Sequence, residues 1–303
     1  MKMEFNNPFQ AEGNWYKGNL HMHTNNSDGT LCPKEMVAEY KKAGYHFLAI
    51  TDHFKLTSVK GLSDKEILVF TGEETNPVGV SDVGWDFEFV AFNIKEEISF
   101  PQIKNPEVHP QEVIDLVLAQ GGEVYLAHPN FASLSIKDTL SLKGLLGIEI
   151  FNPISGLGGR SYSVVHWDDL LTRGIKTFGF AADDSHSGVC LNAGYIMVKA
   201  TALSKKAITE SIRKGLFYST NGPRILNLTI EDNQVSVFTP KVKCINFVGN
   251  IPFFGGCQAQ SRAGKGSSVN RATYRLKGGE KYIRVECTDE EGKSAWTNPI
   301  FFS

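Results

Sequence analysis

The densest group of residues able to do chemistry is the segment His21-Met22-His23, with Asp28 five residues after its second histidine. The two histidines end an apolar stretch, and in a β-strand residues two apart point to the same side because side chains alternate between faces. Two imidazoles on one face can hold a divalent ion. Far downstream, the segment Asp183-Asp184-Ser185-His186 offers ligands of the same kind. We therefore expect both segments to contribute to one metal site.

Further histidines and carboxylates follow short runs that are rich in Val, Ile, Leu or Phe. The sequence places them at Asp52-His53, Glu73-Glu74, His128 and Asp183-Asp184. In a barrel of parallel strands surrounded by helices, all carboxyl ends of the strands open onto one face, where such barrels carry out their chemistry. Mixed nitrogen and carboxylate ligands suit Zn, Mn or Fe, and the sequence lacks the cysteine set of a structural zinc site. The ligands should converge although they are spread over more than half of the chain.

The elements that must position these residues alternate between strands and helices over residues 18–200. Helices are expected from Pro33 and from Pro110, because proline favours the first turn, and both patterns end at glycine. Each predicted helix is followed by a strand, as βαβ units require. From about Pro223 onward, short strands are separated only by turn signals, which predicts a small immunoglobulin-like β-sandwich. Within it, residues 258–270 are expected to form a surface loop.

Composition limits the classes of function. The chain has 303 residues, 41% of them hydrophobic and 21% charged, which describes a soluble globular protein. Its net charge of −2 gives no electrostatic reason to expect a nucleic acid or a membrane as partner. Five scattered cysteines predict no disulfide framework and favour the cytoplasm, and the first residues lack the apolar core of a signal peptide. No feature of the sequence indicates an oligomeric state.

The ordered motifs resemble those of the polymerase and histidinol phosphatase (PHP) superfamily of metal-dependent phosphoesterases. They are His21-Met22-His23-Thr24, Ser27-Asp28-Gly29, Ile50-Thr51-Asp52-His53, Gly72-Glu73-Glu74, Ala127-His128-Pro129 and Asp184-Ser185-His186. The resemblance covers about residues 15–223. Shorter motifs are similar to the branch that includes carbaryl-type ester hydrolases: Glu149-Ile150-Phe151-Asn152, His166-Trp167-Asp168-Asp169-Leu170-Leu171 and Tyr218-Ser219-Thr220-Asn221-Gly222-Pro223. The resemblance implies an α/β fold with a distorted (β/α)7-type barrel over residues 1–223. The β-sandwich that the strand and turn pattern predicts then covers residues 224–303.

The resemblance also implies a first metal site formed by His21, His23 and Asp184. Glu74 would bridge from this site to a second ion. We expect Glu74 rather than Glu73 in that role because the family pattern is Gly-x-Glu, which leaves a structural role open for Glu73.

Asp28, His53 and His186 would hold a further ion, although Ser-Asp-Gly is also a turn sequence by itself. His128 would complete the second site. There the sequence departs from the family, because Glu88 stands where a histidine often precedes a short strand. Glutamate binds the same metals through oxygen but changes the charge and softness of the site. The expected cofactors are thus two or three divalent ions of Zn, Mn or Fe.

Other polar residues receive supporting roles. Asp52 is expected to orient a metal-bound imidazole, a common need of such ligands. Arg160, on a glycine-rich loop, can present a guanidinium to phosphate oxygens, or the loop is a plain connector; Arg224 is a second candidate. The three remaining histidines are expected to be structural: His46, His109 and His166.

The family resemblance implies a hydrolase in which a metal-activated hydroxide attacks a small phosphoester, either nucleotide-like or sugar-like. Asp184, or a water on the metal, would then give a proton to the leaving group. The same hydroxide attacks trigonal carbon, so hydrolysis of a carboxyl or carbamate ester is an alternative. A second alternative is a non-catalytic binding module with structural metals, whose β-domain engages a glycan or a protein.

Overall fold

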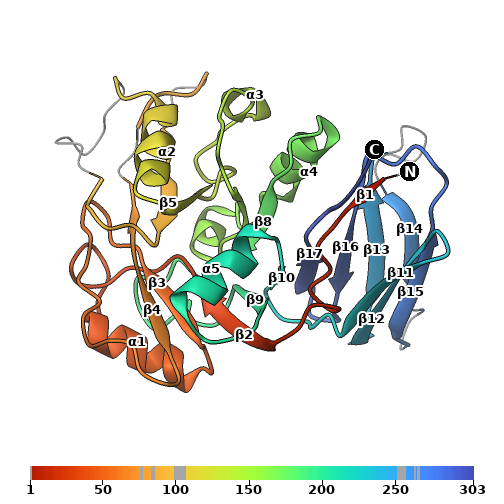
Figure 1. The fold of residues 1–303 in the computed structure, drawn as a ribbon, viewed down its shortest axis with the longest axis horizontal. Helices are drawn as coiled ribbons and strands as arrows, with labels where there is room; N and C mark the ends of the chain where they lie inside the picture. Colours follow the sequence, from red (N-terminus) through yellow and green to blue (C-terminus); the bar gives the residue numbers. More distant parts are fainter. Residues whose placement is uncertain are drawn as a thin grey trace.

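The computed structural model describes residues 2–75, 78–82, 86–98, 107–250, 257–262, 264 and 267–303. It has a mixed α/β fold in which an α/β part, from β2 to β10, lies beside an all-β part, made of β11 to β18 together with β1 (Figure 1). A 15-stranded sheet runs through both parts, because β10 of the first pairs with β17 of the second.

The two helices predicted from Pro33 and Pro110 begin at these residues, and further helices follow. The helices are α1 (Pro33–Lys42), α2 (Pro110–Ala119), α3 (Ile136–Thr139), the 3-10 helix η1 (Ile154–Gly158), α4 (Val164–Thr172) and α5 (Lys205–Arg213). In α1 and α2 the side chains of Glu35 and Glu112 accept hydrogen bonds from the backbone N–H of the residue before the helix, at 3.0 and 3.2 Å. These bonds satisfy amide groups that a helix start otherwise leaves without a partner.

The strands of the α/β part form a mixed sheet in the order β10-β9-β2-β3-β4-β5-β6-β7-β8. They are β2 (Asn14–Asn19), β3 (Phe47–Ile50), β4 (Leu68–Glu74), β5 (Phe89–Phe92), β6 (Glu123–Leu126), β7 (Gly147–Phe151), β8 (Phe178–Ala181), β9 (Tyr195–Ala200) and β10 (Phe217–Thr220). Neighbours are parallel from β2 to β4 and from β6 to β8, whereas β5 is antiparallel to both β4 and β6. The amino end of β5 therefore lies beside the carboxyl ends of β4 and β6.

The chain segments that follow β2 and β8 meet at this same edge. Met22 and Ser185 form an isolated parallel bridge. The N–H of Asp184 donates to the carbonyl of His21, and the N–H of His23 donates to the carbonyl of Ser185, both at 2.9 Å. Backbone pairing thus places the two ligand-rich segments next to each other.

Strands β3, β5, β6 and β7 are buried on both faces, which explains why they read as nearly continuous apolar runs. On one face, aromatic side chains from different strands pack against one another. Among them are Phe70, Tyr125 and Phe180, all at most 1% exposed. The other face is covered by helices, for example by Val113 and Val117 of α2. The side chains at the strand ends are held by a rigid frame.

The all-β part consists of two sets of strands with a core between them. They are β1 (Met3–Glu4), β11 (Asn227–Glu231), β12 (Gln234–Val242), β13 (Cys244–Gly249), β14 (Cys257–Arg262), β15 (Val269–Arg275), β16 (Tyr282–Thr288), β17 (Ser294–Thr297) and β18 (Ile300–Phe302). Strands β11, β12 and β15 form a separate sheet, and the others belong to the large sheet. The expected loop over residues 258–270 is wrong in part, because β14 pairs with β13 over most of its length.

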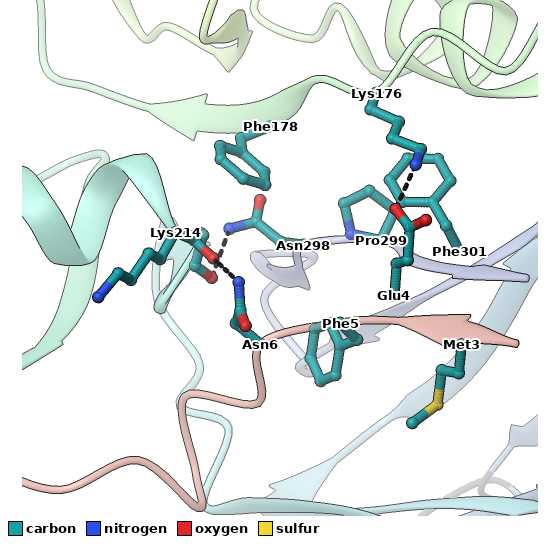
Figure 2. Close-up of a pocket in the computed structure, with 11 residues that line it drawn as sticks. Met3, Glu4, Phe5, Asn6, Lys176, Phe178, Lys214, Asn298, Pro299 and Phe301 are labelled. Carbon is teal, nitrogen blue, oxygen red and sulfur yellow. Dashed lines mark hydrogen bonds and ion pairs between the residues drawn. The ribbon is translucent and has the colours of Figure 1, made fainter.

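Strand β1 joins the two ends of the chain, since Met3 pairs with Phe302. A hollow of about 450 Å³ lies beside it, between the N-terminal segment, the start of β8 and the turn before β10 (Figure 2). Glu4 contacts Lys176 there, and Asn6 donates to the carbonyl of Lys214 at 2.9 Å. This hollow is at the amino end of β8, whereas the ligand-rich segment follows its carboxyl end. Among the described helices, none is long and apolar enough to cross a lipid bilayer.

Candidate metal centre

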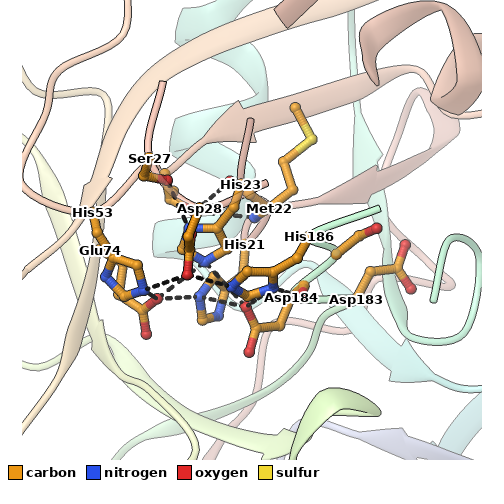
Figure 3. Close-up of polar contacts among 12 residues, drawn as sticks. His21, Met22, His23, Ser27, Asp28, His53, Glu74, Asp183, Asp184 and His186 are labelled. Carbon is orange, nitrogen blue, oxygen red and sulfur yellow. Dashed lines mark hydrogen bonds and ion pairs between the residues drawn. The ribbon is translucent and has the colours of Figure 1, made fainter. Parts of the chain in front are cut away.

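Nine residues that the sequence nominates as ligands lie together at one edge of the α/β sheet. Figure 3 labels these members of the set: His21, His23, Asp28, His53, Glu74, Asp184 and His186. The nine residues form three overlapping groups: His21, His23, Glu74 and Asp184; Glu74, Glu88 and His128; and His23, Asp28, His53 and His186. Within each group the candidate ligand atoms lie within 4.8 Å of one another.

The central group is buried and tightly spaced. His21 Nε2 lies 2.9 Å from Glu74 Oε2 and 3.2 Å from Asp184 Oδ1, and His23 Nε2 lies 3.1 Å from each of these oxygens. Two atoms that bind one ion at about 2.0–2.2 Å lie roughly 3.0–3.5 Å from each other. Three of these atoms are buried without a hydrogen-bond partner among the described residues: His21 Nε2, His23 Nε2 and Asp184 Oδ1. Buried polar atoms that converge without bonding one another fit a shared cation.

The second group shares Glu74 with the first. Glu74 directs Oε2 to the histidines of the central group, while its Oε1 lies 3.0 Å from His128 Nε2. On the other side, His128 Nε2 lies 3.7 Å from Glu88 Oε2. Glu88 reaches this edge because it directly precedes the antiparallel strand β5. Glu74 therefore stands in a bridging position between two groups.

The third group faces solvent. Asp28 Oδ2 lies 3.2 Å from His186 Nε2 and 3.9 Å from His53 Nε2, and Asp28 Oδ1 lies 3.6 Å from His23 Nδ1. The Asp28 side chain is 54% exposed, compared with 2% for Glu74. The ligand cluster thus opens to solvent through this group.

Glu149, which the sequence analysis gave no role, holds two parts of the cluster. Its Oε1 lies 2.9 Å from His21 Nδ1, and its Oε2 accepts from the N–H of His128 at 3.0 Å and from Asn152 Nδ2 at 2.9 Å. Asn152 Nδ2 also lies 2.9 Å from Asp184 Oδ2, to which it donates. A carboxylate that accepts from Nδ1–H leaves Nε2 of the imidazole as the free nitrogen, which is the usual support of a metal-bound histidine. The feature of the sequence that could have indicated this role is a glutamate within an otherwise apolar run, which forms the buried strand β7.

The expectation that Asp52 orients an imidazole is wrong. Its carboxylate accepts from the hydroxyls of Thr24, Ser27 and Thr57, at 2.7 and 3.0 Å for the first two. A second bond to Thr24 comes from that residue's backbone N–H. Asp52 is buried beneath the turn that carries Asp28, so it fixes this turn rather than a ring.

Asp183 and Asp184 point in different directions (Figure 3). Asp184 enters the ligand cluster, whereas Asp183 accepts hydrogen bonds from Tyr45 Oη and from the backbone N–H groups of residues 192–194, at 2.7–3.0 Å. Burial raises the pKa of the Asp183 carboxyl to about 6, although these donors act in the other direction. Asp183 closes the loop that begins with His186.

The charges of the cluster depend on one another. Burial by itself would raise the pKa of Glu74, but His21 and His53 lower it well below its usual range. Burial and the neighbouring Glu74 raise the pKa of Glu88 to about 7. Burial would lower the pKa of His128, yet Glu74 and Glu88 raise it to about 10. The carboxylates thus make this site attractive to cations, and bound metals would compete with protons for the imidazoles.

The two arginines are placed differently. Arg160 is exposed, and its Nη1 donates to the carbonyl of Asn130 at 3.0 Å and to Ser133 Oγ. The guanidinium therefore lies against the turn that begins at His128, which keeps it at the ligand edge. Arg224 is exposed in the connection from β10 to β11, and no hydrogen bond or ion pair among the described residues joins it to the ligands.

The remaining histidines have structural contacts. His46 Nδ1 accepts from the N–H of Lys17 at 3.1 Å, and His109 Nδ1 accepts from the N–H of Gln111 at the start of α2. His166 Nε2 lies 2.7 Å from the carbonyl of Leu134.

Residues 19–130 match the profile of the PHP domain. Over these residues the chain is similar to a PHP domain. The matched segment contains seven of the nine candidate ligands: His21, His23, Asp28, His53, Glu74, Glu88 and His128. Asp184 and His186 lie beyond it and are brought to the others by the pairing of the segments after β2 and β8.

Solved structures resemble the chain at low sequence identity. A two-domain protein from Bacteroides vulgatus, described as containing a predicted PHP-like metal-dependent phosphoesterase, is 15% identical, with a TM-score of 0.53 over 94% of this chain and 95% of that one. A proposed metal-dependent phosphoesterase from Bifidobacterium adolescentis is 19% identical, with a TM-score of 0.41 over 56% of this chain and 87% of that one. The lesion-specific endonuclease PfuEndoQ from Pyrococcus furiosus is 15% identical, with a TM-score of 0.41 over 67% of this chain and 56% of that one. None of the curated proteins matches the chain significantly. The first likeness indicates a shared fold over nearly the whole chain.

Proposed function

We propose that the protein is a metal-dependent phosphoesterase that hydrolyses a small phosphomonoester. The observation that carries this proposal is the convergence of His21, His23, Glu74 and Asp184, whose buried nitrogen and oxygen atoms lie 2.9–3.2 Å apart without hydrogen-bonding one another. Divalent ions held there would supply hydroxide near neutral pH and offset the negative charge on the substrate oxygens. The PHP domain supports the same assignment.

The chain's own residues would prepare this chemistry. Glu149 keeps His21 in the tautomer that leaves Nε2 free, and Asn152 holds the second oxygen of Asp184. The imidazoles lower the pKa of Asp184 despite its burial, so it is a carboxylate, suited to accept a proton rather than to donate one. Arg160 would bind the non-bridging oxygens of the phosphoryl group.

The three groups can hold two or three ions of Zn, Mn or Fe, since their donors are imidazoles and carboxylates. The group of Glu74, Glu88 and His128 has two carboxylates and one imidazole, which makes it the most oxygen-rich of the three. A hard ion such as Mn²⁺ suits it better than a soft one.

We also propose that the α/β part is a distorted (β/α)7-type barrel within residues 1–223, and that residues 224–303 form an immunoglobulin-like sandwich. The bridge between Met22 and Ser185 supports closure of the barrel beside the ligands. The net charge of −2 favours a small substrate over a nucleic acid. A cytoplasmic location stays a prediction.

Hydrolysis of a carboxyl or carbamate ester is the second candidate. It is favoured by the exposed rings of Phe54 and Phe131, which stand beside two candidate ligands. The likeness to carbaryl-type ester hydrolases stays a prediction. A non-catalytic binding module is disfavoured because all nine candidate ligands are present and converge.

A hydrolysis screen tests the proposal. The purified protein would be assayed with Zn, Mn or Fe on phosphomonoesters, phosphodiesters and carboxyl esters. We expect phosphate release that a chelator stops, and a loss of roughly 100-fold or more in His21→Ala. His109→Asn is the matched control, because asparagine also caps a helix and this residue lies at α2. Ester turnover without phosphate release would replace the proposal with its alternative.

A further inference from the structure

Two phenylalanines are exposed directly beside the candidate ligands. Phe54 is 42% exposed and Phe131 is 48% exposed. Single exposed apolar residues are ordinary on protein surfaces, so exposure alone has no meaning here. Both rings, however, lie in the segments after β3 and β6 that carry the candidate ligands His53 and His128, at the same edge of the sheet as the metal centre.

Phe131 stands next to the second group of ligands. Its ring centroid lies 5.4 Å from that of His128, and the two planes are nearly perpendicular at 81°. The N–H of Phe131 donates to the carbonyl of His128 at 2.9 Å, which fixes the start of this turn. Arg160 contacts the same turn on both sides of Phe131, through Asn130 and Ser133. The turn that carries the Phe131 ring therefore also holds the Arg160 guanidinium.

Phe54 stands next to the third group. Its ring centroid lies 5.6 Å from that of His53, with the planes tilted by 35°. Its backbone has a φ of +57°, a conformation that a bulky residue rarely adopts. Strain of this kind persists where the surroundings enforce it, and it concentrates at functional sites. The strained backbone holds an apolar ring at the cluster, with 42% of the residue exposed.

The two rings flank one carboxylate. His53 Nε2 lies 3.5 Å from Glu74 Oε2, and His128 Nε2 lies 3.0 Å from Glu74 Oε1. Pairwise contacts thus link Phe54 through His53, Glu74 and His128 to Phe131, with Glu74 between the two histidines and an exposed ring beside each histidine. A phosphomonoester whose phosphoryl group binds at the ligand cluster can place the rest of the molecule against one of these rings.

We propose that Phe54 and Phe131 form an aromatic subsite, and that the substrate is a phosphomonoester whose alcohol carries a planar ring, as in an aryl or nucleoside monophosphate. This rests on the proposed phosphoesterase function and narrows it, because a sugar or an open-chain alcohol offers no flat face to stack. Stacking on an aromatic side chain tolerates different rings, since every such ring has a π-face. Hydrolysis consumes one water, breaks the P–O bond to the alcohol, forms a P–O bond to the water oxygen, and releases phosphate and the ring-bearing alcohol.

Kinetics on three substrates tests the subsite: phenyl phosphate, a nucleoside 5′-monophosphate and glycerol 3-phosphate. The variants are Phe131→Ala and Phe54→Asn, because asparagine tolerates positive φ and removes the ring without adding strain. We expect kcat/KM to fall about tenfold for at least one ring-bearing substrate and to change less than about twofold for glycerol 3-phosphate. Phe131→Tyr should restore the loss in Phe131→Ala. Leu116→Ala, an exposed residue on α2, is the control that changes none of the three.

Binding gives a second readout that does not depend on turnover. Calorimetry with the protein as purified would compare phenylphosphonate with methylphosphonate, and we expect the phenyl compound to bind at least about tenfold more tightly. That preference should disappear in both variants. Equal binding of the two phosphonates, or equal losses on all three substrates, overturns the aromatic subsite and leaves the phosphoesterase standing. Selective phenylphosphonate binding without phosphate release from any substrate supports the subsite and contradicts the phosphoesterase.

Discussion

His21 and Glu149 form a fully buried pair in which Nδ1 of the ring lies 2.9 Å from Oε1 of the carboxylate. The pair joins β7 to the segment after β2, and it determines which ring nitrogen of His21 is free. Without the carboxylate, the imidazole would lose both its orientation and its preferred tautomer. Glu149 contacts no second candidate ligand through an ion pair, but it also accepts from the backbone of His128.

Glu149→Gln should weaken metal binding about 10- to 100-fold, because the amide keeps the volume but loses the charge that supports Nδ1–H. The measurement is metal retention against a chelator of known affinity. Glu73→Gln is a matched control: burial raises the pKa of Glu73 to about 8, so this side chain is largely neutral at pH 7. If Glu149→Gln retains metal as well as Glu73→Gln does, the pair has no role in holding His21.

Glu88 gives a test of the departure from the family pattern. Glu88→Ala should lower the number of metal ions per chain, because it removes one of three donors in its group, whereas Glu88→His should restore the number. Elemental analysis of the purified variants measures this directly. An alanine variant with unchanged metal content and rate would make Glu88 a bystander, and His128 would then bind its ion through other partners.

The sequence was sufficient to nominate the ligands because their chemistry and their places at strand ends are local properties. His21, His23 and Asp184 meet as expected, since the segments after β2 and β8 pair. Glu88 was nominated only through the family resemblance. In a barrel of parallel strands, ligands follow the strands, whereas Glu88 precedes β5. The antiparallel direction of β5 explains why Glu88 still reaches the ligand edge.

Roles that depend on contacts between residues far apart in the chain could not be predicted from the sequence. Glu149 acquires its role only when His21 lies opposite, 128 residues away in the chain. Asp52 was misassigned because a carboxylate beside a histidine in sequence bonds hydroxyls of a distant turn instead. Strand β14 has the polar sequence CQAQSR, which resembles a loop, and it pairs with β13 at a sheet edge, where polar residues are common.

Arg284 should be important for the junction of the two parts. It is 1% exposed on β16, and its Nε and Nη2 each donate to the carboxylate of Asp168 on α4 at 2.7 Å. Its Nη1 donates to Glu286 at 3.0 Å, and the guanidinium lies over Trp167. Arg284→Ala should lower the free energy of unfolding by about 1.5–3 kcal/mol, since it removes the charge-assisted hydrogen bonds between a buried guanidinium and two carboxylates that are 28% and 23% exposed. Chemical denaturation measures the loss.

A double variant separates charge from packing at this junction. Asp168→Asn together with Arg284→Met removes the paired charge and keeps much of the volume, so it should recover part of the stability lost in Arg284→Ala. Exposed Arg173 is the control position, because its pair with Asp169 is on the surface and contributes at most about 1 kcal/mol. Equal, small effects at Arg284 and Arg173 would show that the buried pair does not hold the parts together.

Lys17 should make stability depend on pH. Burial lowers its pKa to about 8 from an ordinary value of 10.5, while its Nζ donates to the carbonyl of Ala43 and to Asn192. A lysine with a lower pKa in the folded state loses its proton more easily there, so stability rises as pH increases from about 8 to 10.5. Lys17→Met should remove this rise. Denaturation of both proteins at several pH values measures the difference, and parallel curves would contradict the assignment.

Variants of Arg160 distinguish phosphomonoester hydrolysis from carboxyl-ester hydrolysis. Its guanidinium lies against the turn after His128, held there through Nη1, so its remaining N–H groups can meet a phosphoryl group at the ligand edge. Arg160→Ala should raise KM or lower kcat on phosphomonoesters by about tenfold, and Arg160→Lys should recover little, because lysine lacks the planar fork. Carboxyl-ester turnover should change less, since a trigonal carbonyl offers no pair of non-bridging oxygens.

Arg224→Ala is the matched control, an exposed arginine without a contact to the described ligands. Equal losses on phosphomonoesters and carboxyl esters would mean that Arg160 only supports the turn; robust ester hydrolysis with no phosphate release would establish the alternative reaction.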